Sequence, residues 1–168
     1  DGRTRPKRLS PGAGRTAAAG GSGEHDTDAM IALLPSAADA QRLAVAGGEP
    51  VDELHLTVAY FADADDLPDP ALVAAQFAGP VTAEVSGHAV FCGGDQPVSV
   101  YLVQADGLSA ANKALAPDGG FDAYVPHITA AYGKTPLVVS GPILFDRIRV
   151  ASRGQSADMP LSADAEGG

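Results

Sequence analysis

Two short segments of the chain carry the same residue types in the same order. The first runs from His55 to Tyr60 (HLTVAY) and the second from His127 to Tyr132 (HITAAY), 72 positions further along. An imidazole accepts or donates a proton near neutral pH, and a hydroxyl donates a hydrogen bond to an anion. Each segment therefore offers the groups needed for acid–base chemistry on a negatively charged substrate.

Strand geometry groups these residues further. In a β-strand successive side chains point to opposite faces, so His55 shares a face with Thr57, and His127 shares one with Thr129. A single such pair is also typical of a histidine that only hydrogen-bonds on a half-buried sheet face. The chance that two of the four histidines acquire this spacing by accident is roughly one in a hundred. The duplication therefore favours a functional pair.

The elements that must position these segments alternate between strand and helix patterns. Ser36 followed by Asp39 resembles a helix-capping box, and Asp69 followed by Pro70 is typical of a second helix start. The sequence predicts an α+β domain in which three helices pack on an antiparallel sheet of six or seven strands. We expect helices over 36–46, 70–77 and 107–115, and strands over 30–34, 54–61, 81–91, 98–104, 124–132, 137–139 and 143–150.

Length and composition limit the class of protein. The chain has 168 residues, of which 45% are hydrophobic and 19% charged. This suits one domain, or two small pseudo-equivalent lobes sharing a core. No apolar run approaches the roughly 20 residues that span a bilayer, so we expect no membrane partner and a cytoplasmic location. The lone Cys92 and the scattered histidines predict neither a disulfide nor a zinc site.

Charge is unevenly distributed along the chain. Five of the eleven basic residues lie within the first fifteen positions, which leaves six basic residues against twenty acidic ones afterwards. A protein that binds a long nucleic-acid duplex needs a basic track to displace counterions. We therefore expect no duplex partner and a substrate that is small or held at one local site.

The two ends differ in composition from the middle. Residues 1–29 are rich in Gly, Ala, Arg and Ser without apolar periodicity, which is typical of a disordered arm or linker. We expect the folded domain over 30–160 and a flexible tail over 161–168. Because the chain opens with Asp1 rather than Met, it is also expected to be part of a larger polypeptide.

From about Met30 to Val150, the duplicated motif and the elements around it resemble the two-histidine (2H) phosphoesterase superfamily. This group includes 2′-5′ RNA ligase-like proteins and cyclic nucleotide phosphodiesterases, and its signature is a pair of His-x-Thr/Ser-x repeats with aliphatic x. The resemblance implies a bilobal, pseudo-twofold fold with antiparallel sheets, helices on the outside, and the two motifs facing each other across a central cleft. The same run also looks like actinobacterial and phage domains, some of them joined to virion proteins.

The resemblance also implies a chemistry. One neutral imidazole of the pair His55 and His127 would take a proton from the attacking group, and the other, as imidazolium, would protonate the departing ribose oxygen. Thr57 and Thr129 would donate hydrogen bonds to the nonbridging phosphate oxygens. No metal and no cofactor is expected. The motifs alone do not say which histidine is the base.

The implied function is cleavage, or reversible ligation, of a nucleotide phosphodiester such as a 2′,3′-cyclic phosphate or a 2′-5′ linkage. Two alternatives remain open: a module that binds a nucleotide or RNA end without turnover, and a folded appendage of a phage virion-associated protein. The chain departs from many RNA-handling relatives, because Tyr132 stands where they carry Arg or Lys, and only Lys134 is a nearby base. Strand parity directs Tyr60 and Tyr132 away from the histidines, so they are left out of the site.

Overall fold

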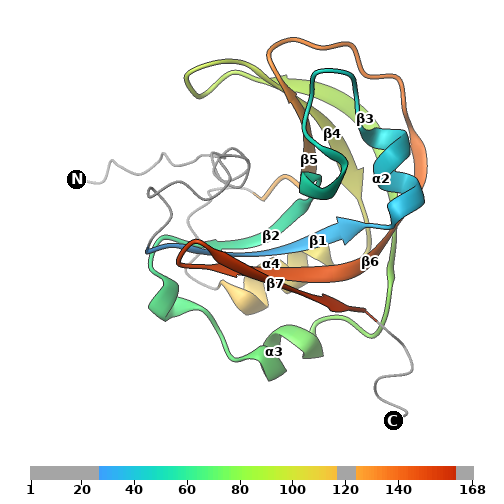
Figure 1. Ribbon diagram of the computed structural model, residues 1–168. Helices are drawn as coiled ribbons and strands as arrows, with labels where there is room; N and C mark the ends of the chain where they lie inside the picture. The colour runs from blue at the N-terminus through green and yellow to red at the C-terminus, as the bar shows by residue number, and fades with distance from the viewer. Residues whose placement is uncertain (1–26, 117–123, 162–168) are drawn as a thin grey trace.

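Seven strands form one antiparallel sheet in the computed structural model, which describes residues 27–116 and 124–161. Their order is β1-β2-β5-β4-β3-β6-β7, and β1 also pairs with β6 (Figure 1). Most of the predicted arm and tail, residues 1–26 and 162–168, lies outside the described residues. The elements are β1 (Ala29–Pro35), α2 (Ala37–Leu43), η3 (Val51–Glu53), β2 (Leu56–Phe61), η4 (Ala64–Asp66), α3 (Pro70–Ala75), β3 (Val81–Phe91), β4 (Val98–Gln104), α4 (Leu108–Leu115), β5 (His127–Tyr132), β6 (Gly141–Ser152) and β7 (Gln155–Pro160).

The long strand β6 pairs with β1, the first strand in this order, as well as with its neighbours β3 and β7. Its first part, Gly141 to Phe145, pairs with β3, and its later part, to Ser152, pairs with β1 on one edge and β7 on the other. Phe145 is fully buried and is the residue at which the partner changes, since it pairs with both Val81 and Pro35. The pairings of β1, β2, β5, β4, β3 and β6 therefore close into a ring, with β7 outside it (Figure 1).

Burial explains why these segments form strands. All seven residues of β1 are buried, as expected for a strand with neighbours on both edges and cover on both faces. In β3, the buried Ala83 and Val85 alternate with exposed residues, the pattern of a strand with one solvated face. The sheet therefore supplies most of the hydrophobic core.

The helices follow their capping residues. The Ser36 hydroxyl accepts a hydrogen bond from the Asp39 amide at 3.2 Å, which confirms the predicted start of α2. Asp69 is the N-cap residue of α3, but its side chain makes no capping hydrogen bond. Helix α4 buries one apolar face, and its Asn112 donates from Nδ2 to the Val58 carbonyl at 2.7 Å. This bond joins α4 to the first motif strand.

One strand prediction was wrong near the C-terminus, and one strand was missed. Residues 137–139 form no strand; Val138 is 86% exposed, and the Val139 carbonyl contacts Nε2 of His88 at 2.6 Å. Strand β7 was not predicted, because its sequence QSADMP is short, contains no β-branched or aromatic residue and is exposed throughout. Pairing with β6 alone creates this edge strand.

Gly48 allows the loop after α2 to contact the second motif strand. The Glu49 amide donates to the Ala130 carbonyl at 2.9 Å, which draws the loop backbone onto β5. A Cβ atom at Gly48 would lie 2.4 Å from that same carbonyl oxygen and 2.7 Å from Val45 Cγ2. The position therefore requires glycine for space.

We expect Gly48→Ala to lower the free energy of unfolding by roughly 1–3 kcal/mol, because backbone must shift to admit the methyl group. Urea unfolding followed by circular dichroism measures the change. Gly94→Ala is the matched control, since a Cβ there meets nothing within 4 Å. Equal stability of the two variants would show that the contact with β5 is not close.

Candidate active site

The two motif strands lie next to each other in the sheet. Strands β2 and β5 pair antiparallel through Leu56 and Ile128, which hold the same position in the two copies of the motif. Both residues are fully buried. Because the strands run in opposite directions, this register places His55 in line with Thr129, and Thr57 in line with His127. Strand pairing thus brings together the four residues that the sequence singled out.

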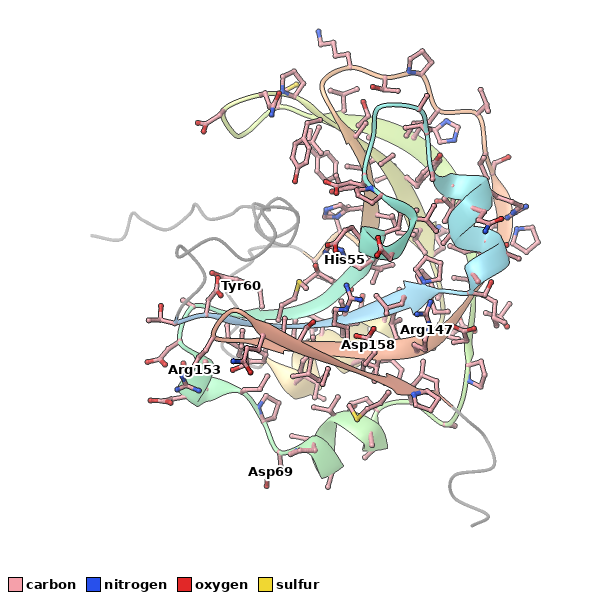
Figure 2. All side chains as sticks on the ribbon, in the orientation of Figure 1. His55, Tyr60, Asp69, Arg147, Arg153 and Asp158 are labelled. Atoms are coloured by element: carbon pink, nitrogen blue, oxygen red, sulfur yellow. The ribbon has the colours of Figure 1, made fainter. Side chains whose placement is uncertain are left out.

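All four side chains lie on the face opposite to Leu56 and Ile128, by strand alternation. His55, Thr57 and Thr129 are buried, whereas His127 is partly exposed. Figure 2 shows His55 in the interior of the molecule, far from the rim where Asp69 and Arg153 lie. The site therefore combines a shielded histidine with a more accessible one.

Both histidines are oriented by the same local contact. Nδ1 of His55 lies 2.8 Å from the Glu53 carbonyl, and Nδ1 of His127 lies 2.8 Å from the Val125 carbonyl, in each case two residues back. A carbonyl oxygen only accepts, so Nδ1 carries the proton in both rings. In the neutral form Nε2 is then unprotonated, which leaves it available to accept or, once protonated, to donate.

The environment disfavours a charge on either ring. Burial lowers the pKa of His55 to about 4; the bond to the Glu53 carbonyl opposes this shift, and the positive charges of Arg149 and His127 add to it. Burial also lowers the pKa of His127, against the bond to the Val125 carbonyl. The charge of His127 is the smallest of the effects on the pKa of His55.

Three surrounding side chains were not predicted from the sequence. The Thr57 hydroxyl donates to Met30 Sδ at 3.3 Å, a weak acceptor that a phosphate oxygen would replace. The Tyr124 hydroxyl donates to the Thr57 carbonyl at 2.8 Å, and the Phe91 ring packs edge-on against His127 at 4.9 Å between centroids. None of the three belongs to a motif, so only their positions in the fold identify them.

Arg149 of β6 is an unpredicted cation that acts electrostatically on His55. Its guanidinium binds Asp158 of β7 through two hydrogen bonds, Nε to Oδ1 at 2.7 Å and Nη2 to Oδ2 at 3.0 Å. Nη1 reaches the Asp52 carbonyl at 3.5 Å, a weak contact. Arg149 therefore bridges the edge strand β7 and the η3 turn that precedes His55.

Other residues considered in the sequence lie outside this group. The Tyr60 hydroxyl donates to Asp28 at 3.0 Å, and Figure 2 shows Tyr60 well away from His55. His88 is held by the Val139 carbonyl and packs on Tyr101. Within residues 27–116 and 124–161, no group of three or more His, Cys, Asp or Glu side chains could hold a metal ion. In the same described part of the chain, no helix is long and apolar enough to cross a membrane.

Solved structures share this arrangement of elements. E. coli LigT complexed with ATP matches with a TM-score of 0.53 at 15% identity, and E. coli LigT complexed with 3′-AMP with 0.50 at 17%; each match covers 81% of this chain and 95% of the other. A crystal structure described as a phosphoesterase matches with 0.50 at 18% identity, covering 81% and 96%. At this identity the likeness shows the fold.

The chain thus has the fold of E. coli LigT and of the structure described as a phosphoesterase, and the resemblance drawn from its motifs is confirmed at the level of the fold. No family model matches the chain, and the search of curated proteins finds no match. The antiparallel sheet expected from the sequence is likewise confirmed.

The depressed pKa of His55 predicts that stability falls in acid. Its value is 6.5 when unperturbed and about 4 in the fold, so the unfolded chain binds the extra proton first and stability is lost as pH falls from 6.5 towards 4. Between about pH 7.5 and about pH 5 we expect His55 to account for a loss of roughly 2 kcal/mol. Urea unfolding of the wild type and of His55→Asn measures it. An identical pH dependence in both proteins would contradict the prediction.

Proposed function

We propose that this chain is a metal-independent phosphodiesterase that acts on a small nucleotide, such as a 2′,3′-cyclic phosphate or a 2′-5′ linkage. The observation that carries the proposal is the register of β2 on β5, which sets two imidazoles and two hydroxyls on one face of the sheet. Both imidazoles have Nε2 unprotonated in the neutral form, since Nδ1 is engaged. The LigT-like fold supports the same class of enzyme.

The reaction proceeds by proton transfer at both ends of an in-line displacement. One neutral imidazole takes a proton at Nε2 from a water molecule as its oxygen bonds to phosphorus. The bond from phosphorus to the ribose oxygen breaks, and the imidazolium of the other histidine gives its Nε2 proton to that oxygen. Hydroxyl hydrogen bonds from Thr57 and Thr129 hold the charge that develops on the nonbridging oxygens. In the reverse direction, ligation, the two imidazoles exchange their roles as acid and base.

The substrate class follows from the neighbours and the charges. LigT has been crystallised with 3′-AMP, ATP and NADP+, each of which contains a nucleotide, and with inorganic phosphate. Each of the four arginines within the described residues is ion-paired with an aspartate, in the pairs Arg42–Asp39, Arg147–Asp146, Arg149–Asp158 and Arg153–Asp65. A long polyanion would find few unpaired cations. A single nucleotide or an RNA end is therefore the proposed partner.

The strand pairings suggest how the substrate is enclosed. We extend the proposal to a bilobal arrangement, in which β7-β6-β1-β2 forms one half and β6-β3-β4-β5 the other, with β6 shared. Each half contributes one motif strand, and the phosphate would sit between them. This arrangement is supported by the change of partners along β6 at Phe145.

His55→Ala and His127→Ala are each expected to lower turnover of 2′,3′-cyclic nucleotides by roughly 10²-fold or more, because each removes a proton-transfer group. Thr57→Ala and Thr129→Ala are expected to cost less, roughly 10-fold, the value of one charge-assisted hydrogen bond. Chromatography of nucleotide products in excess EDTA measures all four. His88→Ala is the control, since its ring binds Val139 outside the site.

If the wild type binds nucleotides without turning them over, the chain is a nucleotide-binding module and not an enzyme. Full activity in the His55→Ala His127→Ala double variant would end the proposal. Loss of wild-type activity in EDTA would contradict its metal independence.

The pH dependence of kcat/KM should be bell-shaped, because one imidazole must be neutral while the other is charged. Burial lowers the pKa of both rings, so the optimum should lie on the acidic side of 6.5. Initial rates on a cyclic nucleotide from about pH 4 to about pH 9 measure it. A flat profile, or an optimum in the alkaline range, would count against the pair.

A further inference from the structure

The two histidines share a motif but not an environment. His55 is 7% exposed, and the guanidinium of Arg149 acts on it electrostatically from β6. His127 is partly exposed and packs in a T-shaped arrangement against the uncharged ring of Phe91. The two copies of the motif therefore have unequal surroundings: His55 is more deeply buried, and Arg149 of β6 adds a positive charge beside its burial.

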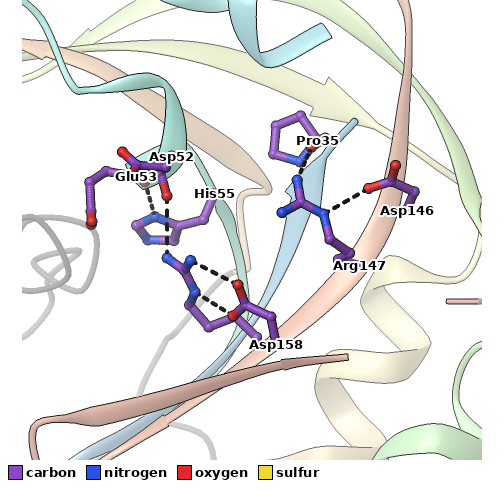
Figure 3. A network of polar contacts seen from close by, with 8 residues as sticks. Pro35, Asp52, Glu53, His55, Asp146, Arg147 and Asp158 are labelled. Atoms are coloured by element: carbon purple, nitrogen blue, oxygen red, sulfur yellow. Dashed lines mark hydrogen bonds and ion pairs between the residues drawn. The ribbon is translucent and has the colours of Figure 1, made fainter. Parts of the chain in front are cut away.

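A continuous chain of contacts ties Arg149 to His55. Asp158 holds the guanidinium through two bonds, and the guanidinium reaches the carbonyl of Asp52. The next carbonyl along η3, that of Glu53, orients the His55 ring (Figure 3). The arginine and the histidine thus contact consecutive peptide carbonyls of one turn, the arginine weakly at 3.5 Å and the histidine closely at 2.8 Å.

The charges around each ring indicate where a proton binds. Facing His55 are Arg149 from β6 and His127 from β5, both of which oppose a positive charge on its ring. The carboxylates of Asp52 and Glu53 on η3 and of Asp158 on β7 act on Arg149, and they hold it in its charged form. Burial opposes a positive charge on the His127 ring, and the contact with the Val125 carbonyl favours that charge. Of the two rings, only His55 thus has a cation from another strand acting on it.

We propose that Arg149, fixed by Asp158, is a positioning residue that adds to burial in keeping His55 neutral as the general base and leaves His127 as the general acid. The inference rests on the proposed phosphodiesterase function and assigns roles that the motifs leave open. In the forward step water loses its proton to His55 Nε2 as its oxygen bonds to phosphorus. The ribose oxygen leaves phosphorus and takes the proton of His127 Nε2.

The roles are tested with a leaving group that needs no proton. Hydrolysis of bis(4-nitrophenyl) phosphate releases 4-nitrophenolate, so it requires the base and not the acid. His127→Ala should lose roughly 10²-fold or more on a 2′,3′-cyclic nucleotide but stay within about 10-fold of wild type on the nitrophenyl ester. His55→Ala should lose roughly 10²-fold on both. The reverse pattern, with His55→Ala rescued, would overturn the assignment.

The part played by Arg149 is tested by titrating the imidazoles by NMR without substrate. Arg149→Gln removes the cation, so the titration midpoint of His55 should rise by at least about 0.5 unit while that of His127 moves less. Arg149→Lys keeps a cation and should restore most of the lowered midpoint. Arg147→Gln is the matched control on the same face of β6, since Arg147 binds Asp146 and the Pro35 carbonyl. An unchanged His55 midpoint in Arg149→Gln would overturn the proposal.

The same variants separate the role of Arg149 from the proposed phosphodiesterase activity. In the pH profile of kcat/KM, Arg149→Gln should shift the midpoint of the acidic limb to higher pH. The midpoint of the alkaline limb should stay near its wild-type pH. If the wild type hydrolyses neither substrate, the phosphodiesterase proposal fails, and the NMR titration still decides whether Arg149 controls His55. If both substrates turn over and the titration does not respond, only the role of Arg149 is lost.

Discussion

The pairing of Leu56 with Ile128 is the contact on which the site depends. These residues carry no chemistry themselves, but their burial fixes the register of β2 against β5. A shift by one residue would turn every side chain of the strand to the other face. His55 and Thr57 would then face the core, and Leu56 would face the site. Apolar burial on one face therefore positions the polar groups on the other.

The rest of the sheet keeps this contact in place. Only one residue pair joins β2 to β5, whereas β1 holds β2 on its far edge and β4 holds β5 through extended registers. Strand β6 connects both sides by pairing with β1 and with β3. The hydrogen bond from Tyr124 to the Thr57 carbonyl adds a direct link across the motif strands. A short pairing at the centre is thus supported by long pairings around it.

A duplicated motif does not require two equal halves. Identical carbonyl contacts orient both rings, so local geometry treats His55 and His127 alike. Burial and the charge of Arg149 then distinguish them. Acid–base catalysis on one phosphate needs such a difference, because one ring must be neutral while the other is charged.

The motif residues, most strands and the α2 cap at Ser36 could be predicted from the sequence, because periodicity and capping are local properties of the chain. The order of the strand and helix patterns also indicated an antiparallel sheet. It did not reveal β7, whose exposed residues carry no pattern and form a strand only by pairing with β6. Folding alone lets Arg149 act electrostatically on His55, which is distant from it in the sequence, and lets the Phe91 ring contact His127. Electrostatics and packing act through space, so residues without a local pattern acquire their roles from the neighbours that the fold provides.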